Sequence, residues 1–436
     1  MMRSVWMGML VVALGGCPGE ARETDPDGGS NTDTDTDVDS DVDSDSDTDT
    51  DTIDPARQLR RYELNVSDDP WVHDVGGNGL GQVEAYDGAV FFTRGRELGT
   101  ASEFFRADEE SSTKFGPVPA PTMGGDGFSS AFERLGDTLY LGVTKSGQGP
   151  LTSAYQLDGT FIDQVETSGL DPLPAGERTT AIYSLAPGWI LGGVTGLSYF
   201  EERNESWEIP WSISSEDFTN GTATIIDIDP GRERVYRTGA DPSNTGARVG
   251  GAHFDGGILL DSWEMTVTID DALAVDLYHG DATDGSVDAA GVARYSLQDV
   301  IANGKPDRSC AWTRFTEDGE EVETFVLGDL VDDIELPTTC FDLVVTTTER
   351  RIVIGWMGSD DVDGGTNQDR WVPFVMGIDP GGDLSWFERL TESETAFFGP
   401  PLTGLRLTIS DDGDLYAVVG HADQPVRIYR FASGLY

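Results

Sequence analysis

The stretch RLTISDDGDLYAVVG, Arg406–Gly420, holds two short β-prone runs separated by a turn of aspartate and glycine. A tight Asp/Gly turn between two such runs predicts an antiparallel β-hairpin. The same order of strand, turn and apolar strand recurs in five other stretches: Val83–Gly95, Ala131–Val143, Ala181–Val194, Ile225–Gly239 and Leu343–Gly358. This recurrence indicates a repeated β unit.

A second kind of hairpin follows most of the first kind at a regular distance. Its members are Ala154–Asp163, Tyr199–Ile209, Ala252–Trp263, Trp312–Phe325 and Val375–Leu390. Two hairpins per unit predict four antiparallel strands, and units spaced about 40–50 residues apart are typical of propeller blades. We place the first-hairpin turns of seven units near Asp87, Gly136, Pro187, Pro230, Asp270, Glu349 and Asp412. The sequence therefore predicts an all-β fold, a seven-bladed β-propeller.

The two ends of the repeat region predict how the ring closes. The last unit ends with Val426–Tyr436 and is one strand short, while Arg57–Val66 precedes the first unit without a partner. Pairing of this N-terminal strand with the last unit would remove both exposed sheet edges. We therefore expect a propeller closed by its N-terminal strand.

Three stretches resemble known propeller repeats. WILGGVTGLSYFEERNESWEI, Trp189–Ile209, resembles one kelch repeat, with Gly192-Gly193 after an apolar strand. Gly377–Trp386 is similar to repeats of quinoprotein-like bacterial propellers, and Ser410–Val419 to repeats of lactonase-type propellers. Each likeness covers one unit, so together they imply the architecture and no shared activity.

The N-terminal segment has the features of an export signal. Arg3 precedes the apolar run Val5–Leu14, which is too short to span a hydrocarbon layer of about 30 Å. The run ends on Leu14-Gly15-Gly16-Cys17, which resembles the lipobox of bacterial lipoproteins. The resemblance implies that residues 1–16 are a signal peptide and that Cys17 carries the lipid. The alternative is a leaderless chain with a buried N-terminal helix.

An acidic tract follows Cys17. Thr24–Asp54 contains 13 aspartates and no basic residue, and it has too few apolar side chains to offset the entropy of ordering. We expect residues 17–54 to form a disordered Asp/Ser/Thr-rich linker, and residues 55–436 to form the folded domain. With Pro18 rather than aspartate after the cysteine, the resemblance favours the outer membrane or the cell surface.

The charge of the chain limits its partners. The formal net charge is −51, and the part after residue 54 holds 64 acidic and 26 basic residues, a net of −38. A field of this sign repels phosphate backbones and attracts cations and basic partners. We expect a monomer that reaches the membrane through its lipid and binds a protein or glycan, but no nucleic acid.

Two cysteines remain after lipidation, Cys310 and Cys340. In an exported protein such a pair predicts a disulfide, with two buried free thiols as the alternative. We expect Cys310 to begin a third strand and Cys340 to precede the first strand of the next unit.

The histidines supply the strongest candidate metal ligands. His279 and His421 each stand two residues before an aspartate, Asp281 and Asp423, and we expect both histidines in loops between second and third strands. Imidazole and carboxylate groups together can assemble a metal site. The one cofactor that the sequence suggests is a divalent cation such as calcium. The alternative is that these two histidines and two aspartates are solvated turn residues. No other cofactor is predicted.

Catalytic motifs give little support to an enzyme. The sequence contains no Gly-x-Ser-x-Gly elbow and no His-Glu-x-x-His helix. We interpret Gly280–Arg308 as a long insertion between strands, since loops of that length often carry function.

Two functions remain open on the sequence. The favoured one is a lipid-anchored binding or interaction module of the cell envelope. The alternative is a metal-dependent propeller hydrolase or lactonase with its site at the mouth of the ring.

Overall fold

The computed structural model describes a large part of the chain after residue 69. The described ranges are 70–75, 78–95, 103–115, 130–143, 151–166, 179–185, 188–193, 196–203, 206–214, 223–229, 234–240, 246–255, 258–283, 285–296, 306–330, 337–358, 370–390, 395–396, 404–420 and 424–431. All of them belong to the unit Ile53–Tyr436. Cys17, the acidic tract, Arg57–Val66, His421 and Asp423 lie outside the described residues.

The described strands form seven antiparallel sheets, which we number one to seven in chain order. Sheet one holds β2 (Asn78–Tyr86), β3 (Ala89–Gly95), β4 (Glu103–Ala107) and β5 (Ser112–Lys114). Sheet two holds β6 (Ser130–Leu135), β7 (Thr138–Val143), β8 (Leu151–Gln156) and β9 (Phe161–Glu166). Sheet three holds β10 (Thr179–Leu185), β11 (Gly188–Gly193), β12 (Gly196–Arg203) and β13 (Ser206–Ser214).

The remaining sheets follow the same pattern. Sheet four holds β14 (Ala223–Asp229), β15 (Arg234–Ala240), β16 (Ala247–Asp255) and β17 (Ile258–Val267). Sheet five holds β18 (Ala274–Thr283), β19 (Ser286–Arg294), β20 (Arg308–Thr316) and β21 (Glu321–Val326). Sheet six holds β22 (Thr338–Val345), β23 (Arg351–Gly358), β24 (Arg370–Ile378), β25 (Leu384–Arg389) and the short β26 (Thr395–Ala396). Sheet seven holds β27 (Leu405–Ile409), β28 (Leu415–Val419), β29 (Val426–Phe431) and β1 (Trp71–His73).

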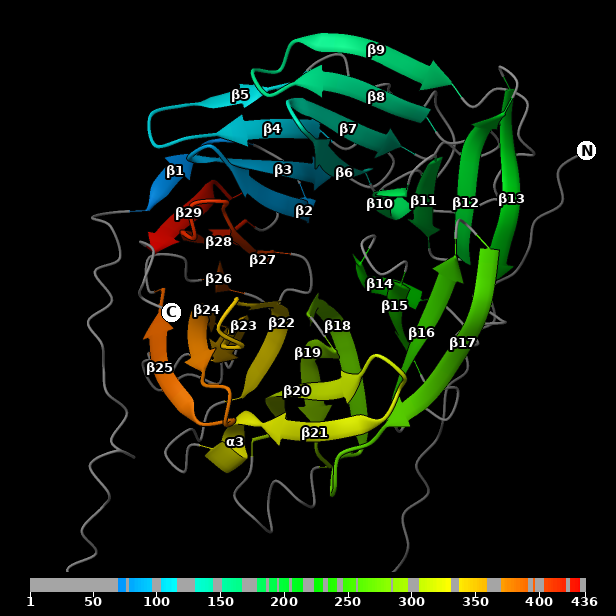
Figure 1. The fold of residues 1–436 in the computed structure, drawn as a ribbon. Coiled ribbons are helices and arrows are strands. Elements are labelled where there is room, and N and C mark those ends of the chain that lie inside the picture. The colour runs from blue at the N-terminus through cyan, green and yellow to red at the C-terminus, as the bar shows by residue number, and fades with distance from the viewer. Residues whose placement is uncertain are drawn as a thin grey trace, which may run out of the picture. The chain divides into compact units, whose positions relative to one another are not determined.

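The first strand of each sheet lies next to the first strand of the following sheet. These seven strands, which we call the inner strands, are β2, β6, β10, β14, β18, β22 and β27. Each contacts the next in this order, and β27 contacts β2. The sheets stand around a common centre with the inner strands nearest to it (Figure 1). The fold is therefore all-β and propeller-like, as the recurring hairpins predict.

Sheet seven joins the two ends of the described chain. β1 pairs antiparallel with β29, with Trp71 opposite Ile428 and His73 opposite Val426. The strand that pairs with the C-terminal strand is thus Trp71–His73 rather than the expected Arg57–Val66. The alternation of buried Trp71, exposed Val72 and buried His73 fits a strand with one face on the core.

Most of the expected hairpins are present, and one loop form recurs. In five hairpins a turn of three residues ends on a residue with positive φ: Gly159, Gly319, Glu349, Gly382 and Gly413. The backbone N–H of that residue donates to the carbonyl three positions before it, as Gly413 does to Ser410 at 2.8 Å. Glycine suits this left-handed position because it has no Cβ, and Glu349, with φ of 60°, is the exception.

The fifth unit differs from the sequence interpretation. Asp271 has a positive φ, and Ala272 N–H donates to Ile269 at 3.1 Å, so the turn near Asp270 exists. However, it joins β17 to β18, and the first hairpin of sheet five turns at Gly285. Gly280–Arg308 is consequently no long insertion, because most of its described residues belong to β18 and β19.

The hydrophobic core lies between neighbouring sheets. Described clusters join sheets one and two through Phe104 and Phe132, and sheets six and seven through Trp356 and Tyr429. Others join four to five, five to six and seven to one. Burial of large side chains between sheets stabilises each sheet on the next, so a single sheet has no complete core of its own.

Outer aromatic side chains pack on loops of the following sheet. Trp263, in the outer strand of sheet four, covers Gly319 of sheet five, and its Nε1 donates to the carbonyl of Glu317 at 2.8 Å. Phe325, in the outer strand of sheet five, covers Gly382 of sheet six in the same way. A Cβ at either glycine would lie 2.5 Å from the aromatic ring, so both positions require glycine.

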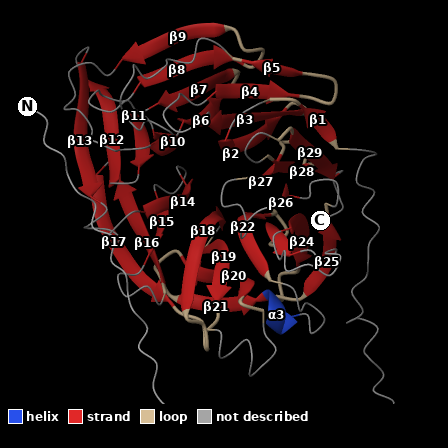
Figure 2. Ribbon diagram, turned by 180° about the vertical axis from the view of Figure 1, so that it is seen from behind, coloured by secondary structure: helices blue, strands red, loops and turns tan. Residues whose placement is uncertain are grey.

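The described helical structure is limited to α3 (Leu327–Leu330), a single short turn after β21 (Figure 2). Among the described residues, none forms a helix with the length and apolar character needed to cross a membrane.

Candidate functional site

Three neighbouring inner strands, β18, β22 and β27, bring the chemistry-bearing residues of the ring together. β18 and β22 each carry a β-bulge against the second strand of their sheet, after Leu277 and after Cys340 respectively. A bulge bends the strand and redirects the side chains beside it. His279 follows the first bulge and lies within the first strand of sheet five. The prediction that it lies in a loop between second and third strands is therefore wrong.

Polar side chains of the inner strands connect four pairs of neighbouring sheets: one with two, five with six, six with seven, and seven with one. In each case a side-chain oxygen accepts a hydrogen bond from a backbone N–H of the following inner strand. These bonds, which we call the inner-strand links, are Gln82 Oε1 with Phe132 N at 2.9 Å, Asp281 Oδ2 with Val345 N at 2.6 Å, Asp342 Oδ2 with Leu407 N at 2.9 Å, and Thr408 Oγ1 with Ala85 N at 3.2 Å. The inner strands lack backbone ladders to one another, and the links satisfy these four N–H groups instead.

The two carboxylates among the inner-strand links have raised pKa values. Burial raises the pKa of the Asp281 carboxyl to about 7, although backbone hydrogen bonds from Val345 and Ala282 oppose the shift. Burial likewise raises the pKa of Asp342 to about 6, and the charge of Arg406 lowers it again in part. Both groups thus titrate close to neutrality while they accept backbone N–H groups.

His279 and Arg406 lie beside the same aromatic ring. The imidazole of His279 is 5.6 Å from the ring of Phe341, and Cζ of Arg406 is 5.0 Å from it. Burial, and then the charge of Arg406, lower the pKa of His279 well below its usual range. His279 is therefore a neutral imidazole next to a guanidinium.

A further acidic side chain, Glu84, lies on the inner strand of sheet one, near Glu133 on the inner strand of sheet two. The pKa of Glu84 is raised to about 8, first by burial and then by the charge of Glu133, while a hydrogen bond from Gln82 opposes the shift. Sequence patterns do not single out Glu84 or Asp342, since acidic residues are frequent throughout the chain, and Arg406 belongs to no catalytic or binding motif. Their position in the first strand of each unit is the signal that could identify them.

The predicted metal set is only partly described. His279 and Asp281 share β18, but Asp281 uses Oδ2 for the N–H of Val345, and His421 and Asp423 lie outside the described residues. Within the described ranges, no three His, Cys, Asp or Glu side chains come together as a metal site. The four-residue site remains a prediction.

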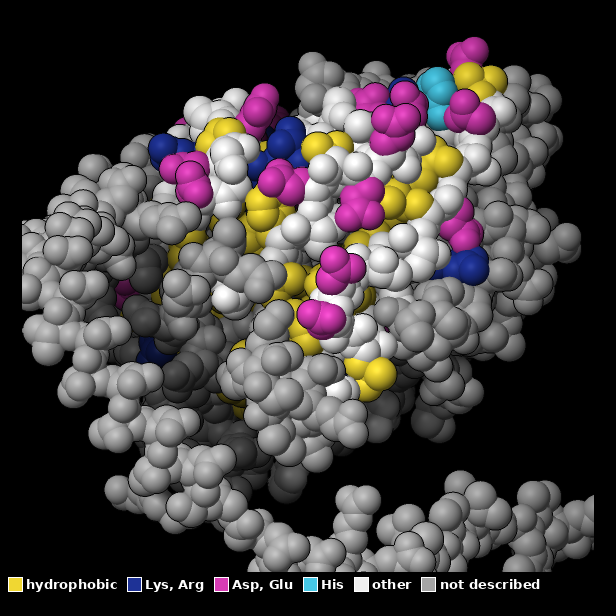
Figure 3. Space-filling model, turned by 90° about the horizontal axis from the view of Figure 1, so that it is seen from below, with side chains coloured by type: hydrophobic (Ala, Val, Ile, Leu, Met, Phe, Trp, Pro, Cys, Tyr) yellow, Lys and Arg dark blue, Asp and Glu magenta, His cyan; other side chains and the backbone are white. Residues whose placement is uncertain are grey.

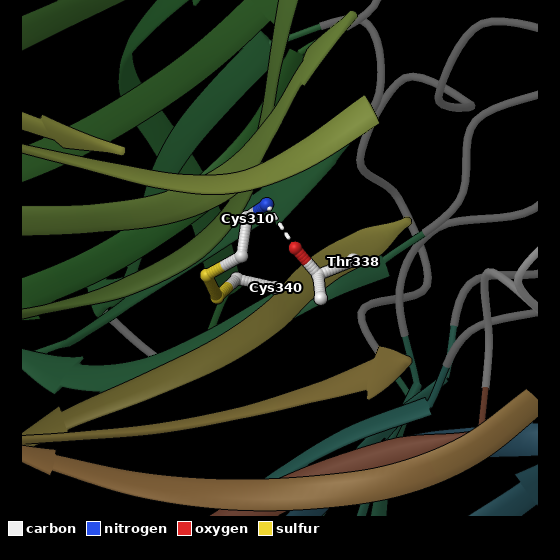
Figure 4. The surroundings of a disulfide bond; sticks show 3 residues. All are labelled: Cys310, Thr338 and Cys340. Atoms are coloured by element: carbon white, nitrogen blue, oxygen red, sulfur yellow. Dashed lines mark hydrogen bonds between the residues drawn. A yellow bond between two sulfur atoms is a disulfide. The ribbon is translucent and has the colours of Figure 1, made fainter. Parts of the chain in front are cut away.

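Cys310 and Cys340 form a disulfide between sheets five and six (Figure 4). Their Cα atoms are 4.7 Å apart, and both side chains are fully buried. Cys310 lies near the start of the third strand of its sheet, as expected, whereas Cys340 lies inside the first strand of sheet six rather than before it. The N–H of Cys310 also donates to Thr338 Oγ1 at 2.8 Å. The bond therefore reinforces one sheet interface.

The described surface is acidic on the face seen in Figure 3, where Asp and Glu side chains lie among neutral and apolar ones. Several basic side chains of the described residues pair with acidic neighbours, as Arg234 does with Glu317 at 2.7 Å and Arg134 with Asp411 at 2.9 Å. Local pairing of this kind reduces the basic surface that an anionic polymer could use.

No protein-family model and no curated protein sequence matches this chain. Solved structures are similar in fold. Hydrazine synthase of Kuenenia stuttgartiensis has a TM-score of 0.50 and 13% identity, over 82% of this chain and 97% of that chain. A puromycin-hydrolyzing peptidase of Mycobacterium tuberculosis has a TM-score of 0.49 and 12% identity, over 82% of this chain and 51% of that chain. At these identities the first likeness supports the propeller-like fold alone.

Proposed function

We propose that this protein is a lipid-anchored envelope or surface protein whose folded part is a seven-bladed propeller that acts as a binding module. The lipobox resemblance of Leu14-Gly15-Gly16-Cys17 supports the anchor, and the acidic composition of Thr24–Asp54 supports a disordered linker between the anchor and the folded part. In this arrangement the propeller stands away from an outer membrane or cell surface.

Three contacts support closure of the ring. β1 pairs with β29, β27 contacts β2, and Thr408 links sheet seven to Ala85 of sheet one. Each of these contacts joins the two ends of the described chain, and with seven sheets in sequence they favour a seven-bladed ring without a free edge.

The observation that supports the binding role is that the polar residues of the inner strands fall into two groups, one that holds neighbouring sheets together and one that does not. Asp281 and Asp342 use oxygen atoms to hold the backbone of the next sheet, so they build the scaffold. His279 and Arg406 stand beside them, half-buried, on strands that the scaffold holds in place. A rigid ring with a few polar groups near its centre is suited to ligand recognition. The ligand class in this proposal is a protein or glycan.

A metal-dependent hydrolase or lactonase is the second candidate. The neutral imidazole of His279, two residues before Asp281, favours it because a metal requires an unprotonated ring nitrogen. The guanidinium of Arg406 opposes it, because a cation bound at His279 would meet a positive charge.

Metal analysis and hydrolysis assays of the purified full-length chain separate the two. The binding module predicts substoichiometric metal after purification and no hydrolysis of simple lactones or esters above that of His279→Ala. Stoichiometric metal together with hydrolysis that is lost in His279→Ala would establish the hydrolase and overturn our proposal.

A further inference from the structure

Arg406 has donor groups that the described fold does not use. Its Nη1 donates to the carbonyl of Leu405 at 2.7 Å, and its guanidinium lies over Phe341. Within the described residues it forms no ion pair, and its side chain is half-buried rather than sealed. A guanidinium carries five N–H donors in a planar fork, so most of them remain available to a ligand.

The acidic group whose charge acts on Arg406, Asp342, does not use these donors. Asp342 attracts Arg406 electrostatically, but its Oδ1 accepts from the N–H of Leu343 at 3.0 Å and its Oδ2 from that of Leu407 at 2.9 Å. The carboxylate is thereby held by the backbone of β22 and β27. Arg406 therefore keeps a positive charge on the inner strands, and among the described residues only the carbonyl of Leu405 accepts a hydrogen bond from its guanidinium.

His279 adds a second polar group beside the guanidinium. Its imidazole, half-buried, has no hydrogen-bond partner among the residues that the structure describes. In its neutral form one ring nitrogen donates and the other accepts. Both His279 and Arg406 lie against Phe341, and the charge of Arg406 acts on His279, so the two groups are neighbours on β18 and β27.

We propose that Arg406 and His279 form a binding site for the carboxylate group of a small ligand. The inference rests on the proposed binding function and names the chemistry of its ligand. A carboxylate matches the planar fork of arginine in a bidentate manner. It also suits the local charge, since the carboxyl of Asp342 acts on the same guanidinium, and a dianion such as phosphate would be repelled by that carboxyl more strongly.

The site can be tested on the full-length chain with small acids and their neutral counterparts. The probes are D-glucuronate with D-glucose, L-lactate with lactamide, and N-acetylalanine with its amide, followed by saturation-transfer NMR. We expect at least one acid to bind while its neutral counterpart does not, and the acid that binds identifies a sugar, hydroxy-acid or peptide source. Inorganic phosphate should compete poorly.

Variants and a direct probe complete the test. Arg406→Gln should weaken binding of that acid about tenfold or more, and Arg406→Lys should weaken it less, because lysine keeps the charge but lacks the fork. Arg248→Gln, at a half-buried arginine on β16, is the matched control and should bind normally. If Arg406→Gln melts at a lower temperature, a second measurement on the unchanged protein tests the site directly. The ring nitrogen signals of ¹⁵N-labelled His279 should shift when the acid is titrated in.

The outcomes separate this site from the proposed function. If no acid binds, if Arg406→Gln binds equally well, if the His279 signals stay fixed, or if phosphate competes as well as the acid, the carboxylate site is refuted while a binding module for another ligand stands. Metal-dependent hydrolysis lost in His279→Ala would refute the binding module, whatever the acids do.

Discussion

Arg351 donates from Nε to Asp288 Oδ1 at 2.5 Å across the interface between sheets five and six, and their side chains are 2% and 0% exposed. Removing one partner would leave an uncompensated charge in the core. We expect Asp288→Ala to lower the free energy of unfolding by about 3–5 kcal/mol, measured by urea denaturation.

The double variant Asp288→Ala/Arg351→Met should recover part of this loss, because it buries no unpaired charge. Arg294→Met is the control, since it breaks the exposed pair with Asp276 and should cost less than about 1 kcal/mol. Equal losses in the buried and the exposed variant would contradict the role of the buried pair.

Glu84 predicts a pH dependence of stability. Its pKa is about 8 in the folded state, against an ordinary value of 4.5, so between these values the folded state binds the proton more tightly than the unfolded state. Its contribution to stability is therefore largest at low pH and is lost as the pH rises towards 8.

Glu84→Gln should remove this loss. The stability of the unchanged protein relative to the variant should fall with pH by at most about 1.4 kcal/mol per unit, and by less where the half-buried carboxyl reaches water. Melting temperatures from pH 5 to 9 measure it, with the exposed Glu110→Gln as control; parallel curves for all three proteins would exclude the effect.

The burial of Trp71 indicates that β1 contributes to the stability of the fold. Its side chain is 8% exposed and its ring lies 5.7 Å from that of Tyr416. We expect Trp71→Ala to cost about 3–5 kcal/mol, while the neighbouring Val72→Ala, at a position that is 56% exposed, costs little.

The corresponding truncations test the same strand. Removal of residues 1–54 should leave the melting temperature unchanged, whereas removal through Asp74 should lower it sharply or make the protein insoluble. Similar melting of the two truncated chains would show that β1 is dispensable.

The disulfide predicts a loss of stability on reduction. Cys310 and Cys340 are 30 residues apart, and closing a loop of this length contributes about 3–4 kcal/mol in the chain-entropy model. The double variant Cys310→Ser/Cys340→Ser should lose this amount in denaturation experiments, and a reducing agent should leave that variant unaffected. Loss of stability on reduction in the double variant as well would assign the effect to something else.

Cys17 predicts attachment to the membrane. Cys17→Ser should move the protein from the membrane fraction to the soluble fraction, because the proposed anchor depends on that one thiol. The same substitution should leave the melting temperature of the folded part unchanged. Retention in membranes after a high-salt wash would refute the lipid anchor.

The sequence predicts the hairpins well because their turns have strong local signals. Asp87-Gly88 and Asp412-Gly413 lie in turns of the expected kind, and their glycines adopt positive φ. Glu349 shows that the same loop also forms with a residue that local preference disfavours, since the flanking strands determine its path.

The candidate site is harder to predict, because it depends on contacts between sheets. The turn at Asp271 has the local chemistry of a hairpin, yet it connects two sheets. For this reason the sequence predicts a loop where β18 lies and places His279 in that loop. Likewise, Asp281 and Asp342 are two of many aspartates until the fold places a backbone N–H from the next sheet against each. Such pairings are not encoded in local patterns.

The pairing of Trp71–His73 with Val426–Phe431 also constrains the order in which the chain can fold. β1 is among the first described segments to be synthesised, but its partner β29 is among the last. Sheet seven can therefore assemble only after the residues through Phe431 have left the ribosome, and contacts of such long sequence separation form slowly. An exported chain would thus remain without its last sheet during passage through the translocation channel and complete its fold on the far side of the membrane.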